Sequence, residues 1–218
     1  MYGNLKKIRN FWNVETMHDA MFERVSKSKT LERSKACFSD DRVLSIIDED
    51  ISLYKEDLSN LKVLDFGCGV GRVLKKISER CKNSYGVDIS QNMLDFAREY
   101  INDDSVTLSL CDNEKIYLES NFFDLIYSFH VLQHIPTEQD LTNSLSEIYR
   151  VQRPGGISVL HFSRKISEED KQSGSFAGFR PTKTNAINMC ENIGFSTKEV
   201  RFVENGSFIL YLEKNKSA

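Results

Sequence analysis

The sequence contains no hydrophobic run long enough to cross a membrane, and its polar N-terminus lacks the apolar core of a signal peptide. Its five cysteines are scattered and show no C-x-x-C spacing, which argues against a zinc ribbon or a disulfide framework. Proline is scarce, and no internal repeat or linker divides the 218 residues. The net charge of −3 argues against a general nucleic-acid binder. We therefore expect a cytoplasmic protein with reduced thiols and room for one α/β domain.

The pattern of apolar residues alternates between strand and helix periodicity, which predicts a doubly wound α/β fold with a mostly parallel sheet. The expected strands are 63–66, 84–88, 106–111, 122–129, 157–162, 197–203 and 208–213. The expected helices are 41–58, 70–81, 182–192 and two that begin after the capping residues Ser90 and Thr137. A turn is expected at Pro154-Gly155-Gly156, and the last two strands are expected to pair as an antiparallel hairpin across Asn205-Gly206.

The chain is expected to have two parts, a helical N-terminal extension over residues 1–40 and a globular domain over residues 41–218. The extension is rich in lysine and arginine. Two interpretations of this charge stay open, a basic lid over an anionic substrate or helices with solvated faces. Trp12 and His18 are candidates for closing over a site, although packing is the simpler role for both.

The most informative segment reads Val-Leu-Asp-Phe-Gly-Cys-Gly-Val-Gly over residues 63–71, with Asp88 at the end of the next apolar run. The pattern indicates a strand, a glycine turn and the start of a helix. Glycines in such a turn allow the backbone to approach a ligand closely. A carboxylate at the tip of the second strand is where a doubly wound sheet binds ribose hydroxyls. A nucleoside-type cofactor at the carboxyl ends of the strands is therefore expected.

The spacing differs from the dinucleotide fingerprint G-x-G-x-x-G. The third glycine comes one residue early, and Arg72 stands where that fingerprint has glycine. Asp65 would repel a pyrophosphate but suits a cationic ligand such as a sulfonium or an ammonium. The pattern Asp65-x-Gly67-x-Gly69-x-Gly71 resembles the first motif of the class I S-adenosylmethionine-dependent methyltransferases. The resemblance covers about Leu61 to Phe162, with weaker likeness to Leu212, and implies a seven-stranded Rossmann-like sheet.

The resemblance implies S-adenosylmethionine as cofactor and a role for each matching residue. Asp65 and the Gly67–Gly71 backbone would hold the methionine part, and Asp88 would accept hydrogen bonds from the ribose hydroxyls. Cys68 and Cys111 lie beside these positions, and a small side chain that fits is the expected role of each rather than nucleophilic catalysis.

The adenine ring would lie against Ile89 and Met93, with Asp112 bonding its amino group and Asn113 offering a backbone amide. A core role for Met93 and a turn role for Asp112 are the alternatives. The complete set predicted to contact the cofactor is Asp65, Gly67, Cys68, Gly69, Gly71, Arg72, Asp88, Ile89, Met93, Asp112, Asn113 and Phe129.

The segment after the fourth expected strand carries His130 and His134, which the resemblance places facing the transferable methyl group. His134 is the first candidate for a general base and His130 the second, because histidine titrates in the useful range. The H-x-x-x-H spacing lacks a third ligand, so no metal is expected. His161 is expected in a strand as a core or edge residue.

The polar connection 164–180 follows a strand and is expected to border the substrate, with Arg164 and Arg180 as candidates for binding an anionic group. The sequence has no Asn-Pro-Pro-Tyr, Asp-Pro-Pro-Tyr or Pro-Cys motif, which disfavours methylation of exocyclic amines and of cytosine carbon.

The predicted function is methyl transfer to an oxygen or nitrogen atom of a small polar metabolite, with a sugar or nucleotide-sugar as first choice. The partner is then a small-molecule methyl acceptor rather than nucleic acid. An RNA or protein methyltransferase, and a non-catalytic S-adenosylmethionine-binding subunit of a complex, are the alternatives.

Overall fold

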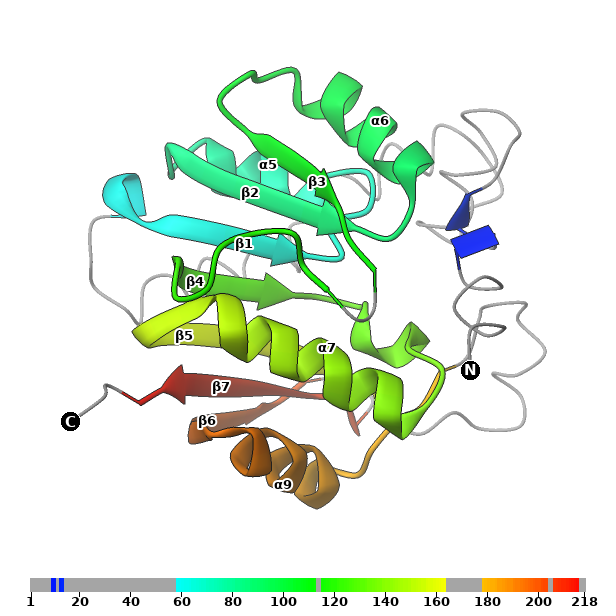
Figure 1. The fold of residues 1–218 in the computed structure, drawn as a ribbon, viewed down its shortest axis with the longest axis vertical. Coiled ribbons are helices and arrows are strands. Elements are labelled where there is room, and N and C mark those ends of the chain that lie inside the picture. The colour runs from blue at the N-terminus through cyan, green and yellow to red at the C-terminus, as the bar shows by residue number, and fades with distance from the viewer. Residues whose placement is uncertain are drawn as a thin grey trace.

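The computed structural model describes residues 9–10, 12–13, 58–112, 115–163, 178–203 and 206–215. Most of the expected N-terminal extension, residues 41–57 of the expected first helix, the 40/41 boundary, His18, Asn113, Arg164 and Asn205 lie outside these ranges. The described residues form one sheet of seven strands with helices on both faces (Figure 1).

The sheet has the strand order β3-β2-β1-β4-β5-β7-β6. Its strands are β1 (Lys62–Phe66), β2 (Asn83–Asp88), β3 (Thr107–Leu110), β4 (Phe123–Ser128), β5 (Gln152–Phe162), β6 (Phe195–Phe202) and β7 (Phe208–Lys214). The first five are parallel, whereas β7 pairs antiparallel with both β5 and β6. The predicted mostly parallel sheet with an antiparallel C-terminal hairpin is therefore confirmed.

The helices α5 (Arg72–Ser78) and α6 (Gln91–Ile101) cover one face of the sheet, and α7 (Glu138–Val151) and α9 (Lys183–Ile193) cover the other. Ser90 and Thr137 cap α6 and α7 as predicted, because their side chains accept the backbone N–H of the third helical residue. Short 3-10 turns lie at η1 (Leu58–Asn60) and η2 (Leu132–His134).

The prediction of a turn at Pro154-Gly155-Gly156 before a strand that begins at residue 157 is wrong. These three residues lie within β5, which begins at Gln152. The pairing with β4 jumps from Phe123–Gln152 to Leu125–Ile157, so the three residues form an irregularity within the strand. The buried Gln152 amide spans this irregularity by bonding the carbonyl oxygen of Gly156 and the hydroxyl of Ser158. This amide satisfies backbone groups that a regular ladder would have paired, which explains why the strand continues.

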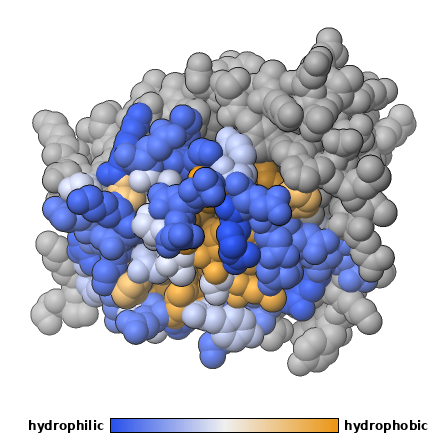
Figure 2. All heavy atoms as spheres, turned by 90° about the horizontal axis from the view of Figure 1, so that it is seen from above, coloured by the Kyte–Doolittle hydropathy of each residue, from blue (hydrophilic) through white to orange (hydrophobic). Residues whose placement is uncertain are grey.

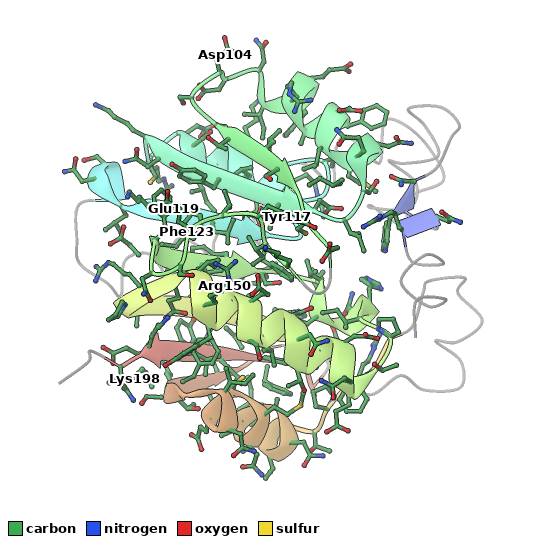
Figure 3. All side chains as sticks on the ribbon, viewed as in Figure 1. Asp104, Tyr117, Glu119, Phe123, Arg150 and Lys198 are labelled. Carbon is green, nitrogen blue, oxygen red and sulfur yellow. The ribbon has the colours of Figure 1, made fainter. Side chains whose placement is uncertain are left out.

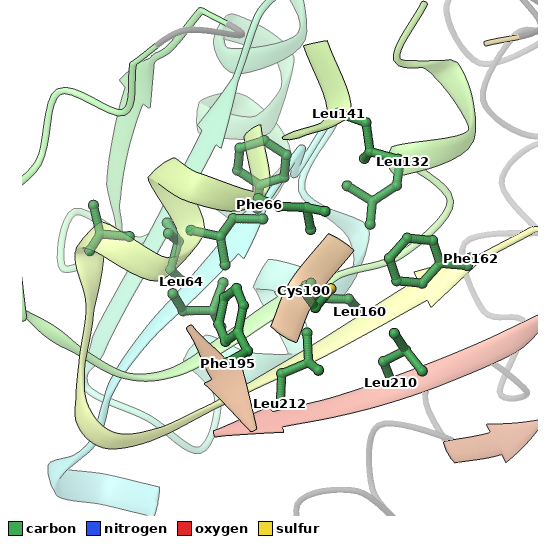
Figure 4. Packing of buried hydrophobic residues seen from close by; sticks show 14 of the residues in the cluster. Leu64, Phe66, Leu132, Leu141, Leu160, Phe162, Cys190, Phe195, Leu210 and Leu212 are labelled. Atoms are coloured by element: carbon green, nitrogen blue, oxygen red, sulfur yellow. The ribbon is translucent and has the colours of Figure 1, made fainter. Parts of the chain in front are cut away.

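The largest core cluster lies between the sheet and the pair α7 and α9 (Figure 4). It joins Leu64 and Phe66 of β1, Leu160 and Phe162 of β5, and Cys190 of α9, all buried. Because β1 and β5 are held from this side, their carboxyl ends are fixed relative to each other.

The surface seen from the end that carries α6 and β3 is covered mainly by hydrophilic residues, with apolar residues between them (Figure 2). The edge strand β3 contributes Leu110, which is exposed. Within the described residues, no helix is both long and apolar enough to cross a membrane.

Candidate functional site

The strand order reverses between β1 and β4, since the chain passes from β1 outward to β3 and then returns to β4 on the other side. The carboxyl ends of parallel strands at such a reversal leave a crevice in which doubly wound folds bind their ligands. The glycine turn follows β1, and the segment carrying both histidines follows β4. In Figure 1 the arrowheads of β1, β2 and β4 point to this edge.

The glycine turn is held against β2 by two hydrogen bonds. The backbone N–H groups of Gly67 and Cys68 both donate to the carbonyl oxygen of Val87, at 2.8 and 3.0 Å. A Cβ on Gly67 would lie 2.4 Å from Val131, so Gly67 permits packing of the β4 loop, whereas a Cβ on Gly69 would meet nothing within 4 Å. Gly69 therefore presents an open backbone, as a ligand-facing position requires.

The carboxylate of Asp88 ends β2 and is 8% exposed. Its Oδ2 accepts the backbone N–H of Gly69 at 2.9 Å, and its Oδ1 accepts that of Ser90 at 2.9 Å. Burial raises the pKa of Asp88, while the backbone N–H groups of Ser90, Gly69 and Ile89 oppose that rise. Asp88 thus joins the glycine turn to the start of α6.

The carboxylate of Asp65 is 3% exposed, and its Oδ2 has no hydrogen-bond partner among the residues that the structure describes. Burial and the neighbouring Asp88 raise the pKa of Asp65 to about 7, against the opposing effects of Arg72 and of the backbone N–H of Leu74. A buried carboxylate oxygen without a partner is costly, so this atom is suited to accept a charged or hydrogen-bonding ligand.

The two thiols of the site are buried and neutral. Burial, followed by the nearby carboxylates, raises the pKa of Cys68 well above its usual range and also that of Cys111. The thiolate is the reactive form of cysteine, so this environment fits small packed side chains rather than nucleophiles.

The end of β3 carries Asp112, whose backbone pairs with Lys115 in an isolated bridge. The Tyr117 hydroxyl donates to Asp112 Oδ2 at 2.9 Å, and this hydrogen bond raises the pKa of Tyr117. Tyr117 is 59% exposed and lies in the loop after β3 (Figure 3). The sequence analysis missed Tyr117, because no motif marks it.

The two residues predicted to contact adenine differ in solvent exposure. Ile89 is half-buried, whereas Met93 is 2% exposed and packs with Val70, Phe96 and Trp12. This environment fits the core role for Met93, and its predicted adenine contact stays a prediction.

The imidazole of His134 is held by Gln133 and Trp12. Gln133 Nε2 lies 3.0 Å from His134 Nε2 and also donates to the carbonyl oxygen of His130 at 3.3 Å. Because a carbonyl only accepts, the amide nitrogen is the atom that faces His134, and His134 Nε2 must be the acceptor. This contact engages Nε2 of the ring, and the role of His134 as a general base stays a prediction.

The side-chain oxygen Oε1 of Gln133 accepts the Ser163 hydroxyl at the end of β5, and the backbone carbonyl of Gln133 accepts the N–H of Gly178 at 2.9 Å. Gln133 thus joins the β4 loop, β5 and the segment after residue 177. The sequence analysis missed this residue, since the contacts come from distant parts of the chain.

His130 has a left-handed backbone, with φ of 58°, and its ring lies 4.5 Å from that of His161. His161 is 5% exposed and also stacks on Phe129, with ring centroids 5.7 Å apart. Burial, with the nearby His130, lowers the pKa of His161 to about 3, so this ring is neutral. The expectation that His161 is a buried strand residue is confirmed.

Arg180 is half-buried beside the Gly178–Phe179 pairing, and Arg164 is outside the described residues. The structure provides no contact that tests either residue as a substrate ligand. In the part of the chain that the structure describes, no group of three or more histidine, cysteine, aspartate or glutamate residues is arranged to hold a metal ion.

Residues 64–160 match the family model described as a methyltransferase domain. Phosphoethanolamine N-methyltransferase 2 of Caenorhabditis elegans is 27% identical over 174 residues, which are 71% of this chain and 38% of that protein. Malonyl-(acyl-carrier protein) O-methyltransferase of Salmonella typhimurium is 39% identical over 95 residues, which are 44% of this chain and 36% of that protein. The chain therefore spans less than half the length of either relative.

Among solved structures, that of magnesium protoporphyrin IX methyltransferase from Synechocystis PCC 6803 with bound SAH is similar, with a TM-score of 0.72 at 18% identity. The similarity covers 96% of this chain and 99% of that chain. At this identity the likeness concerns the fold, and it agrees with the strand order and helix layers described above.

Proposed function

We propose that this chain, whose residues 64–160 form a methyltransferase domain of the class I S-adenosylmethionine-dependent kind, methylates an oxygen or nitrogen atom of a small polar molecule. The observation that carries the proposal is the carboxylate pair Asp65 and Asp88 at the strand reversal. One carboxylate is fixed by backbone N–H groups, and the other has a buried oxygen without a partner among the described residues.

The residues of the site fit such a cofactor in charge and in shape. The sulfonium of S-adenosylmethionine supplies the methyl group to the acceptor when the cofactor is bound. Asp65 would take a cationic or hydrogen-bonding group of the methionine part, and the open backbone at Gly69 would allow close approach. Asp88 would orient the ribose, and Asp112 the adenine amino group.

Little charge develops in methyl transfer that needs a dedicated partner, so orientation and exclusion of water are the main tasks of the protein. His134 would serve the acceptor side as an orienting group rather than as the base, because Gln133 holds its Nε2. His130 is the alternative candidate for receiving the acceptor's proton, since its side chain is exposed at the same edge.

The acceptor is proposed as a small polar molecule, with a sugar or nucleotide-sugar as the first class to test. The two relatives named above act on phosphoethanolamine and on a malonyl group carried by a protein, so their acceptors differ. The names of these two relatives support methyl transfer to an acceptor and do not narrow the class of the acceptor. Arg164 and Arg180 are proposed to bind an anionic part of the acceptor.

Calorimetry with S-adenosylhomocysteine tests the cofactor site, with NADH as the control ligand. We expect saturable one-site binding of S-adenosylhomocysteine and none of NADH, and the reverse result would contradict the proposal. Incubation with S-adenosylmethionine and a metabolite extract, followed by mass spectrometry, then identifies any newly methylated compound. Tight cofactor binding without methylation of any compound would favour the non-catalytic subunit instead.

A further inference from the structure

The described N-terminal residues lie at the carboxyl edge of the sheet, far in sequence from the strands they meet (Figure 1). The Ser90 hydroxyl is 2.7 Å from Asn13 Oδ1 and 3.1 Å from the carbonyl oxygen of Trp12. Since Ser90 has one hydroxyl proton, the shorter contact to Asn13 is the principal hydrogen bond. Trp12 is thereby fixed beside the start of α6.

The indole of Trp12 has two sets of neighbours. It packs on the buried Val70 and Met93, next to the glycine turn. It also meets His134 in a T-shaped arrangement, with ring centroids 5.3 Å apart at 72°. Trp12 therefore touches both the proposed cofactor side and the segment after β4.

These contacts form a continuous series across the site. Asp88 Oδ1 accepts the N–H of Ser90, the Ser90 side chain holds Asn13 and Trp12, and the Trp12 ring meets His134. We propose that Trp12 is a positioning residue that couples occupancy of the Asp88 site to the placement of His134. This inference rests on the proposed function, because it takes the ribose of the cofactor as the group at Asp88.

The chain offers a direct probe, because Trp12 is its only tryptophan. A protonated imidazole in contact with an indole quenches its fluorescence, since the imidazolium accepts an electron from the excited ring. We expect the emission of the wild type to fall as the pH is lowered through the range in which histidine titrates. His134→Gln should abolish that step, whereas His130→Gln, whose ring lies against His161, should keep it.

Coupling is tested by adding S-adenosylhomocysteine to the same protein. We expect a saturable change in Trp12 emission and a shift of the midpoint of the pH step by about half a pH unit, a threefold change in the His134 equilibrium. Asn13→Ala removes the shorter of the two Ser90 contacts without touching the helix cap and leaves the contact to the Trp12 carbonyl oxygen, so it should retain the pH step and weaken the ligand response. In Trp12→Phe, two-bond ¹H–¹⁵N spectra of the His134 ring should show no shift on adding the ligand.

The outcomes separate the two proposals. If calorimetry detects S-adenosylhomocysteine binding but neither the emission nor the His134 midpoint responds, the coupling proposal is overturned and the proposed function stands. If no binding is detected, both are overturned. A wild-type emission step that survives His134→Gln would overturn the contact between the two rings.

Discussion

The two halves of the carboxyl edge differ in the sequence separation of the residues that contact each other. In the half formed by β1, β2 and β3, Asp88 bonds Ser90 two residues on and Gly69 nineteen residues back. In the half formed by β4 and β5, Gln133 bonds Ser163 thirty residues on and Trp12 comes from the N-terminal segment. Apart from Trp12 and Asn13, which also reach Ser90 in the first half, the first half is built by neighbouring segments. The second half is built by segments that only the complete fold brings together.

This difference affects what each half can do. Backbone N–H groups and carboxylates of fixed geometry suit a ligand that is the same in every reaction cycle, such as a cofactor. Side chains supplied by distant segments are free to differ between proteins of one fold, which suits an acceptor-binding region. We therefore expect variants in the first half to change cofactor affinity, and variants in the second half to change turnover.

The largest effect is expected for Asp88→Ala. The variant loses the proposed ribose contact and both backbone partners of the carboxylate, so we expect S-adenosylhomocysteine to bind about 100-fold more weakly. Calorimetry measures the loss. Asp95→Ala on α6 is the matched control, since the Asp95 side chain is 56% exposed and paired with Arg98 at the surface. Wild-type affinity in Asp88→Ala would remove this residue from the site.

Asp65→Asn is expected to weaken binding of S-adenosylmethionine by about thirtyfold, because a buried charge that faces a cationic ligand is lost. It should also stabilise the ligand-free protein above pH 7. The folded-state pKa of about 7 lies above the unfolded value, so ionisation of Asp65 lowers stability as the pH rises from about 4 to about 7. We expect the variant to gain about 4 kcal/mol in the free energy of unfolding at pH 8.

Denaturant unfolding of both proteins at pH 8 and at pH 4 checks this expectation. The difference between variant and wild type should be small at pH 4, where the carboxyl group is protonated in the folded state and about half protonated in the unfolded state. A variant that is less stable than the wild type at pH 8 would show that the Asp65 carboxylate stabilises the ligand-free fold. That result would contradict its proposed role as a ligand-binding group.

The predictability of the site follows the same division. The strand–turn–helix pattern and Asp88 were available from the sequence because glycine spacing and strand ends are local properties. The Ser90 and Thr137 caps were predictable for the same reason. The strand order required the fold itself. Gln133 carries no motif, and the set of contacts that places it against His134 Nε2 forms only when β4, β5 and residue 178 meet.

His134→Ala tests the second half. Because Gln133 occupies Nε2, we expect loss of orientation rather than loss of a base, with kcat reduced about tenfold and cofactor affinity unchanged. The assay uses the acceptor found in the extract experiment and follows kcat against pH. A fall of about 100-fold or more, with loss of the acidic limb of the profile, would show that His134 is the general base after all.

The smallest effect is expected at Tyr117, whose hydroxyl donates a hydrogen bond to the Asp112 carboxylate. Its neighbours in the chain are anchored independently, because Arg150 donates to the carbonyl oxygens of Ile116 and Leu118 (Figure 3). Removing the hydroxyl should therefore leave the loop in place and change only the orientation of Asp112.

Tyr117→Phe should weaken S-adenosylhomocysteine binding about fivefold, the effect of one hydrogen bond that orients another. S-inosylhomocysteine has an oxygen in place of the adenine amino group and so offers Asp112 no N–H at that position. It should therefore bind equally to wild type and variant. Tyr149→Phe is the matched control, as that ring packs on Phe195. Equal losses for both ligands would mean that Tyr117 shapes the loop as a whole. The proposed contact between Asp112 and the adenine amino group would then be removed from the first half of the site.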